Sequence, residues 1–319
     1  MFRKAIAFLT SFLMLTALAG CGGAGESSAQ SQPVLSSGPS DTVSNTAADK
    51  KIQVTVTFNA MKEFTEAVGK DRVEVSTMIP DGTEPHDFEP KAQDLAGLSS
   101  AQVFVYNGFG MESWAEKAVD AAENPNLVAV EASKGAKPIQ NEEEDAIREH
   151  GQYDPHLWIS LKGAEKEAEN IRDGLTQADP SSEDYYKTNC ADFVAQLESL
   201  YSEYKGKFQS VSNKSFVTGH AAFAYLCRDF NLKQNSVENV FAEGEPSAQK
   251  LGELVDYCQK NHVKTVFVED MVSPAVSKTL ADQVGADVQK IYTMESGEDG
   301  KTYLDRMRSN LQEIYDSLS

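Results

Sequence analysis

Apolar and polar positions follow two rhythms along this chain, that of β-strands and that of amphipathic helices. Residues 52–58 (IQVTVTF) alternate with the period of a strand, and residues 61–69 follow with helical spacing and a closing glycine. Strand patterns return at residues 73–79, 101–108 and 127–133. Strands that alternate with helices predict parallel β-α-β units.

Two helical segments then follow one another with no strand between them, at residues 161–178 and 181–211. In the second segment, apolar residues return near the helical spacing. At 1.5 Å per residue, a helix of about 30 residues spans about 45 Å, which exceeds one small domain. We therefore expect this helix to reach from one half of the protein to the other.

The alternation of strand and helix patterns resumes in the last third of the chain. Strand patterns lie at residues 214–220, 263–270 and 288–293, and helical patterns at residues 222–230, 247–261, 273–285 and 303–319. The restart predicts a second unit of the same α/β class.

The expected fold is therefore α/β, with two Rossmann-like lobes at residues 51–180 and 213–319. A long helix at residues 181–212 joins them. In parallel sheets, ligands bind beyond the carboxyl ends of the strands. The cleft between two such lobes is the natural place for a binding site.

The N-terminus indicates export. Residues 1–20 have a basic start and a short apolar run, which is too short for a spanning helix. The run ends in Leu-Ala-Gly before Cys21, which resembles the bacterial lipobox. We expect a lipoprotein signal peptide, lipidation of Cys21, and a flexible Gly/Ser-rich tether at residues 21–50. The alternative is an ordinary signal peptide followed by a chance cysteine.

Charge narrows the choice of ligands. The formal net charge is −20, and it becomes −22 when Arg3 and Lys4 leave with the signal peptide. Such a chain is poorly suited to nucleic acid, whose phosphates require a basic surface. The charge is compatible with a cationic ligand, and equally with a merely soluble acidic surface.

Three cysteines remain in the body of the chain, and their spacing fits no CxxC zinc pattern. An exported protein can join two of them. Cys227 and Cys258, on neighbouring predicted helices, are the expected pair. The alternative is that these two and Cys190 are all buried thiols.

Four side chains that suit a metal ion lie past predicted strands or at the mouth of a helix. They are His86, His156, His220 and Glu295. Three imidazoles and one carboxylate form a tetrahedral set that suits Zn²⁺. Imidazole also suits copper, nickel and iron, whereas Mn²⁺ prefers more carboxylate ligands.

Each histidine also has a structural interpretation. His86 fits a loop cap, His156 fits packing against the neighbouring tryptophan, and His220 fits a hydrogen bond to a carbonyl group. Their common position at one edge of the fold favours a metal site. His150, in an acidic loop, is interpreted as solvated, and His262, at a helix end, as structural.

Several segments, in this order over nearly all of the chain after the tether, resemble one protein family. They are PDGTEPHDFEP, NGFGMESW, DPHLWIS, FVTGHAAFAYL, EPSAQKLGEL, VFVED and IYTMESGEDGKTYLDRMRSNL. The chain resembles the metal-binding lipoproteins of bacterial ABC importers for zinc and manganese, the cluster A-I solute-binding proteins. The resemblance implies two lobes joined by one long rigid helix, with a metal ion held between the lobes.

Carried over to this chain, the resemblance implies that His86, His156 and His220 are ligands together with an acidic residue of the last loop. Glu295 is the expected fourth ligand, and Glu269 and Asp270 are alternatives, as ligands or as supports of a ligand. Histidine at the third position resembles the zinc members. Manganese members usually place a glutamate there, so Mn²⁺ is the less favoured metal.

The resemblance implies that the protein captures Zn²⁺ outside the membrane and delivers it to an ABC permease and its ATPase, as a lipid-anchored monomer serving zinc homeostasis. The alternatives are a manganese or iron protein of the same family, a surface adhesin and a zinc hydrolase. A hydrolase is disfavoured because neither HExxH nor GxSxG occurs in the chain. We therefore expect no enzymatic activity.

Overall fold

The computed structural model of the protein describes residues 51–141, 147, 151–242, 246–271 and 273–319. The expected signal peptide, the lipidated Cys21, the tether and His150 lie outside these residues. Within the described part of the chain, no helix is both long enough and apolar enough to cross a membrane.

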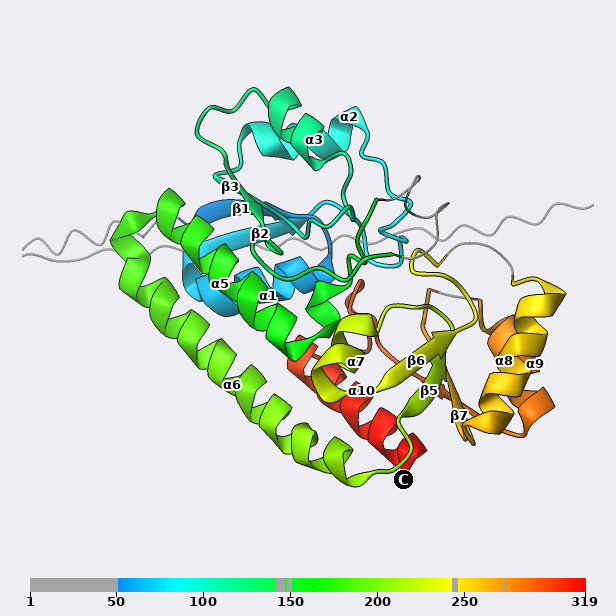
Figure 1. The fold of residues 1–319 in the computed structure, drawn as a ribbon. Helices are drawn as coiled ribbons and strands as arrows, with labels where there is room; N and C mark the ends of the chain where they lie inside the picture. Colours follow the sequence, from blue (N-terminus) through cyan, green and yellow to red (C-terminus); the bar gives the residue numbers. More distant parts are fainter. Residues whose placement is uncertain (1–50, 142–146, 148–150, 243–245, 272) are drawn as a thin grey trace, which may run out of the picture. The chain divides into compact units, whose positions relative to one another are not determined.

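The first sheet consists of four parallel strands in the order β2-β1-β3-β4 (Figure 1). They are β1 (Ile52–Val56), β2 (Val73–Thr77), β3 (Val103–Tyr106) and β4 (Val128–Glu131). Val54 of β1 lies opposite Val75 of β2 and Val103 of β3. Both faces of the central strands are buried, as expected for a parallel sheet covered by helices.

Helices cover the two faces of this sheet. On one face, Val105 shares a core cluster with Phe64 of α1 (Asn59–Gly69) and Ala168 of α5 (Leu161–Ala178). On the other face, Phe104 packs with Ala118 of α3 (Ala115–Ala121), beside the short α2 (Ala92–Leu95) (Figure 1). Short 3-10 turns lie at Lys70–Arg72, Ala96–Ser99, Leu157–Ile159 and Pro180–Ser182.

The second sheet repeats this topology with parallel strands in the order β6-β5-β7-β8. They are β5 (Ser215–Thr218), β6 (Lys233–Ser236), β7 (Thr265–Val268) and β8 (Asp287–Lys290). The accompanying helices are α7 (Ala224–Phe230), α8 (Ala248–Lys260) and α9 (Pro274–Val284). In both sheets the chain changes direction beside the first strand, which creates the crevice where ligands of such folds bind.

The sequence pattern missed β6. Its residues, KQNS, carry no apolar alternation because β6 is an edge strand whose outward side chains meet solvent or polar groups. Only Ser236 in this strand is buried. A polar edge strand gives no periodic apolar signal, so it cannot be recognised by its pattern.

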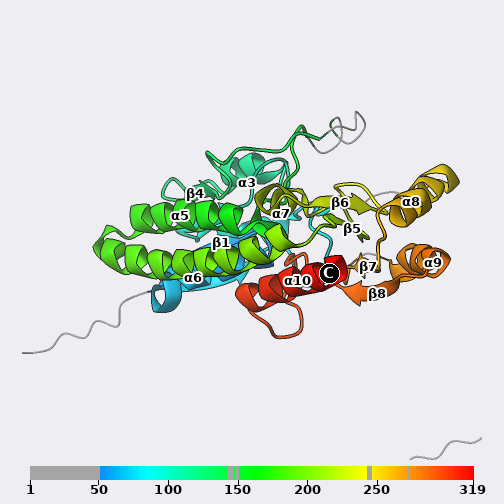
Figure 2. The ribbon, with the colours of Figure 1, turned by 60° about the horizontal axis from the view of Figure 1, so that its bottom comes forward.

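The expected long helix is α6 (Glu183–Ser210), with 28 residues and a length of about 42 Å at 1.5 Å per residue. It lies beside α5 and α1 near the first sheet, and its other end contacts α7 and α10 (Tyr303–Leu318) near the second (Figures 1 and 2). One core cluster includes Val54 of β1, Leu197 of α6 and Phe216 of β5. The two lobes therefore share a continuous apolar core.

The predicted disulfide between Cys227 and Cys258 is wrong in this structure, where both residues and Cys190 are buried free thiols. The physical reason is that the two side chains belong to different core clusters. Cys227 of α7 packs in the cluster that spans both lobes, whereas Cys258 of α8 packs in a separate cluster of the second lobe. Burial raises the pKa of the Cys258 thiol to about 11, so it stays protonated at neutral pH.

Candidate metal centre

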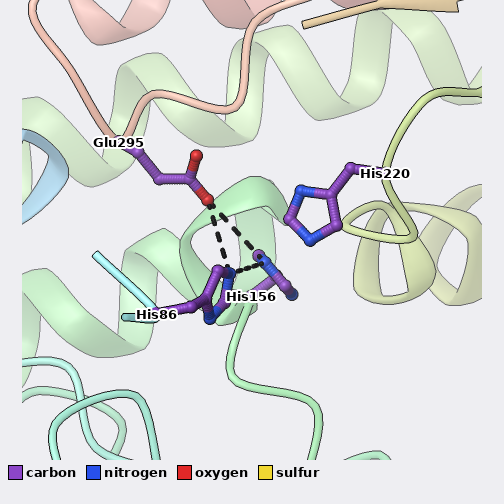
Figure 3. A group of neighbouring side chains, drawn as sticks. All are labelled: His86, His156, His220 and Glu295. Atoms are coloured by element: carbon purple, nitrogen blue, oxygen red, sulfur yellow. Dashed lines mark hydrogen bonds and ion pairs between the residues drawn. The ribbon is translucent and has the colours of Figure 1, made fainter. Parts of the chain in front are cut away.

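The four side chains expected at a metal site meet in the structure (Figure 3). One ligand atom from each of His86, His156, His220 and Glu295 lies within 4.8 Å of those of the other three. The loop after β2 contributes His86, and the residue that opens the turn before α5 is His156. The loops after β5 and β8 contribute His220 and Glu295.

The distances within this group fit a small tetrahedral ion. The Nε2 atoms of His86 and His156 are 3.1 Å apart, and Glu295 Oε1 lies 3.9 Å and 3.8 Å from them. Ligands about 2.0–2.1 Å from a tetrahedral Zn²⁺ stand about 3.3 Å from one another. The separations among these three donors bracket this value, and the His220 donor lies within 4.8 Å of them, so inward movement of the side chains would complete the polyhedron.

The sequence DPH fixes the orientation of His156. Its Nδ1 and its backbone N–H each lie 2.9 Å from Asp154 Oδ1. A carboxylate only accepts here, so Nδ1 carries the proton and Nε2 presents its lone pair to the other ligands. A carboxylate behind a histidine is the usual support for a metal ligand. His156 is fully buried, which excludes competing water from the ring.

His220 is held by a different set of groups. Its Nε2 lies 2.7 Å from the carbonyl oxygen of Val240, so this nitrogen donates and Nδ1 keeps the lone pair. Its backbone N–H donates to Glu269 Oε1 at 3.1 Å, and its carbonyl accepts from Thr218 and Gln234. Burial, and then the charge of neighbouring His156, lowers the pKa of His220 to about 3. The ring is therefore neutral.

The two alternative acidic residues lie elsewhere. Glu269 supports the backbone of His220 and is not among the four clustered residues. Asp270 is exposed and pairs with Lys290 at 2.7 Å. The structure thus places Glu269 as a support behind a ligand and Asp270 outside the centre.

Glu295 is a buried carboxyl group whose charged form has no compensating partner in the described structure. Its Oε2 accepts from the Thr293 hydroxyl at 2.6 Å, while Oε1 faces the histidines with no hydrogen-bond partner in the described structure. Burial, and then the charge of Glu84, raises the pKa of Glu295 well above its usual value. Burial also raises the pKa of Glu84 to about 7. A bound cation would relieve both penalties, which is the electrostatic signature of a cation site.

A cavity of about 850 Å³ adjoins the supports of the centre. It lies between residues 139–141 of the first lobe and elements of the second lobe, including β6 and α7. Asp154 and Val240, which hold His156 and His220, line its wall. None of the four clustered residues lines this cavity, but they come from loops of both lobes, as expected for a site between the lobes.

The family described as "Zinc-uptake complex component A periplasmic" matches residues 54–317. The chain belongs to this family. Its members are components of transport complexes and not enzymes, in agreement with the expectation from the sequence.

Individual relatives agree with this assignment. A Treponema pallidum protein that carries a metal-binding description is 43% identical over 277 residues, which cover 84% of this chain and 88% of that protein. The high-affinity zinc uptake system protein of Bacillus subtilis is 34% identical over 281 residues, with the same coverage. The structure of the laminin-binding protein of Streptococcus agalactiae superposes with a TM-score of 0.78 and 34% identity, covering 85% of this chain and all of that one.

Sequence reasoning identified the four clustered residues and named Glu269 as a possible support, but it missed Asp154 and the Val240 carbonyl. The role of Asp154 could have been predicted from the sequence, because an acidic residue two positions before a histidine can reach its Nδ1 atom. The role of the Val240 carbonyl could not, because a backbone acceptor 20 residues away leaves no signal in the residue types.

Proposed function

We propose that this protein is the extracytoplasmic binding component of an ABC importer, and that it captures Zn²⁺ with His86, His156, His220 and Glu295. The permease receives the ion, and the ATPase is the further subunit of the importer. One observation carries the proposal. Three imidazole rings and one buried carboxyl group offer ligand atoms that lie within 4.8 Å of one another. Oε1 of this carboxyl group, on Glu295, has no hydrogen-bond partner among the described residues.

The donor set favours zinc over manganese. Imidazole nitrogen is a good ligand for Zn²⁺, whereas hard Mn²⁺ prefers oxygen donors and a higher coordination number. Three of the four donors here are nitrogen atoms. Membership of a zinc-uptake family supports the same choice. Zinc is the cargo of the site and leaves it again on delivery.

The N-terminal segments complete the proposal. Cleavage after residue 20 would leave Cys21 to carry lipid, and residues 21–50 would tether the body to the outer face of the cell membrane. The lobe limits of 51–180 and 213–319, with the helix at 181–212 between them, belong to the same proposal. A monomer suffices for this function, because each chain carries all four proposed ligands.

A competition titration tests the metal assignment. Metal-stripped protein is titrated with Zn²⁺ in the presence of excess Mn²⁺, beside a His156→Ala variant and a His262→Ala control. We expect one tight zinc equivalent that Mn²⁺ does not displace, retained in the control and lost in His156→Ala. Tight binding of Mn²⁺ with weak binding of Zn²⁺ would overturn the assignment of zinc as the cargo. Unchanged zinc binding in His156→Ala would overturn the assignment of the site.

A second candidate function is adhesion. The Streptococcus agalactiae relative is described as a bifunctional protein with adhesin and metal transporting activity. An adhesive surface on this chain would bind laminin with the same affinity in metal-loaded protein and in His156→Ala. Absence of laminin binding in both would remove this candidate.

A further inference from the structure

The loop that carries Glu295 belongs to the second lobe in sequence, but it forms hydrogen bonds with the first lobe. It follows β8, the last strand of the second sheet. Nevertheless, the backbone N–H of Asn59, at the start of α1, donates to the Glu295 carbonyl at 3.3 Å. The indole N–H of Trp158 donates to the Thr293 carbonyl at 2.7 Å. Both donors belong to the first lobe.

The same loop is held on its far side by the turn after β2. The backbone N–H of Gly82 donates to Ser296 Oγ, and the backbone N–H of Gly297 donates to Asp81 Oδ1, each at 2.9 Å. The Ser296 hydroxyl also approaches Met271 of the second lobe, at 3.6 Å. Hydrogen bonds to the first lobe thus flank the ligand on both sides.

A partly buried ion pair contacts this loop. Arg306, in the first turns of α10, is fully buried, and its guanidinium contacts Glu63 Oε1 of α1. The other end of the guanidinium donates to the Ser296 carbonyl, the residue after the ligand, at 2.5 Å. Glu63 also accepts from the Asn59 side chain at 2.6 Å. The pair therefore connects α1 directly to the loop that bears Glu295.

The start of α10 is itself anchored in the first lobe. The Tyr303 hydroxyl donates to the Trp158 carbonyl at 2.6 Å, and the Tyr303 ring packs on Phe64 of α1 with centroids 4.8 Å apart. The hydrogen bonds of His220 in the described part of the chain are different, because they all lie within the second lobe, to Val240, Glu269 and neighbouring residues. His220 is therefore the proposed ligand whose hydrogen bonds do not connect it to the first lobe.

We propose that Glu63 and Arg306 are positioning residues that bind the Glu295 loop to the first lobe. His86, His156 and Glu295 then form a preassembled three-ligand group, which His220 of the other lobe completes. This inference rests on the proposed metal site. Preassembly lowers the cost of ordering a carboxylate when the ion arrives. Removing the pair should loosen Glu295 and leave the other ligands in place.

The choice of variant matters, because removing one charge leaves its buried partner uncompensated, which destabilises the fold strongly. The double variant Glu63→Gln/Arg306→Met removes both charges together, so that neither charge is left unpaired. Glu66→Gln, on an exposed position of the same helix, is the matched control. The melting temperature of each metal-free variant shows that it is folded.

The test is a mutant cycle on zinc affinity, measured by chelator competition in the full chain. We expect the double variant to bind zinc about 10- to 100-fold more weakly, the range for residues that support a metal ligand. In a Glu295→Ala background the same double variant should cause no further loss, while in a His220→Ala background the loss should persist.

Two results would overturn the positioning role. One is unchanged zinc affinity in the double variant. The other is an equal further loss in the Glu295→Ala background, which would show that the pair acts through general stability. If the parent itself binds no zinc, the proposed function fails, and this outcome is distinct because the cycle has no starting affinity.

Discussion

At the scale of single residues, the candidate centre depends on which atoms carry protons. Asp154 keeps a proton on Nδ1 of His156, and Val240 keeps one on Nε2 of His220. Both rings therefore present a lone pair before any ion arrives. Orientation by hydrogen bonding is one way in which a protein makes a weak collection of donors into a tight site.

Replacing Asp154 with Asn should weaken zinc binding about 10- to 100-fold, because the Asn amide can donate to Nδ1 and move the imidazole proton towards the ion. Asp120→Asn, on the exposed side of α3, is the control for the loss of one negative charge. Affinity is measured by chelator competition. Equal affinities for the Asp154 variant and the parent would show that tautomer control is unimportant here.

The buried carboxyl groups should make zinc binding release protons. Burial raises the pKa of Glu295, so the metal-free site holds its proton to a higher pH, and zinc must displace it. Affinity should then fall as pH falls, by about tenfold per pH unit for each proton released. The neutral His220, with a pKa of about 3, does not contribute between pH 5 and 8.

Calorimetry in two buffers of different ionisation enthalpy counts these protons directly. Glu295→Gln should bind zinc more weakly and release fewer protons than the parent at the same pH. If the parent protein released no protons on binding zinc at pH 6, this result would contradict the protonated state of Glu295 in the metal-free site.

At the scale of elements, helix α5 contains a buried carboxyl group outside the candidate metal centre. Glu167 is fully buried, and neither of its oxygens has a hydrogen-bond partner in the described structure. Burial, and then the charge of Glu112, raises its pKa well above 4.5. Stability from this group is complete below the unfolded pKa near 4.5 and is lost as pH rises through the folded pKa.

Glu167→Gln should therefore lose less stability than the parent between pH 4.5 and pH 8. The difference is about 1.4 kcal/mol for each unit by which the fold raises the pKa. Urea unfolding of metal-free protein at the two pH values measures it. Glu169→Gln, on the exposed side of the same helix, should follow the parent. Identical pH dependence in parent and Glu167→Gln would be incompatible with a buried acid of raised pKa.

The apolar strand β1 was predictable from its pattern, and the polar strand β6 was not. Val54 and Val56 alternate with polar residues at the period of a strand, and this alternation predicted β1. The polar β6 left no such signal. Likewise, His86 and His156 could be placed at strand ends and helix mouths, whereas the contact of Glu63 with Arg306 joins positions 243 apart. Pairings of this kind depend on tertiary packing, which no local period encodes.

At the scale of the whole described body, the lobes share one apolar core through α6 and α10. Hinged binding proteins close around their ligands by rotation about flexible connections. Here such a rotation would have to separate Phe216 of β5 from the cluster that also contains Val54 of β1. We therefore expect only small lobe movements when zinc binds.

Spin labels at Glu116→Cys on α3 and Glu253→Cys on α8, both exposed positions, report the distance between the lobes. The buried native thiols should not react. The distance distribution should keep its mean and become narrower when zinc is added. A shift of the mean as large as in a hinged binding protein would contradict the shared core as a restraint.

The central claim is that one zinc ion is bound by His86, His156, His220 and Glu295, and anomalous diffraction at the zinc edge tests it most directly. Crystals of zinc-loaded protein should show one strong peak per chain among these four side chains. Its bonds to three nitrogens and one oxygen should be about 2.0–2.2 Å. A peak elsewhere in the chain, or none among these residues, would contradict the account.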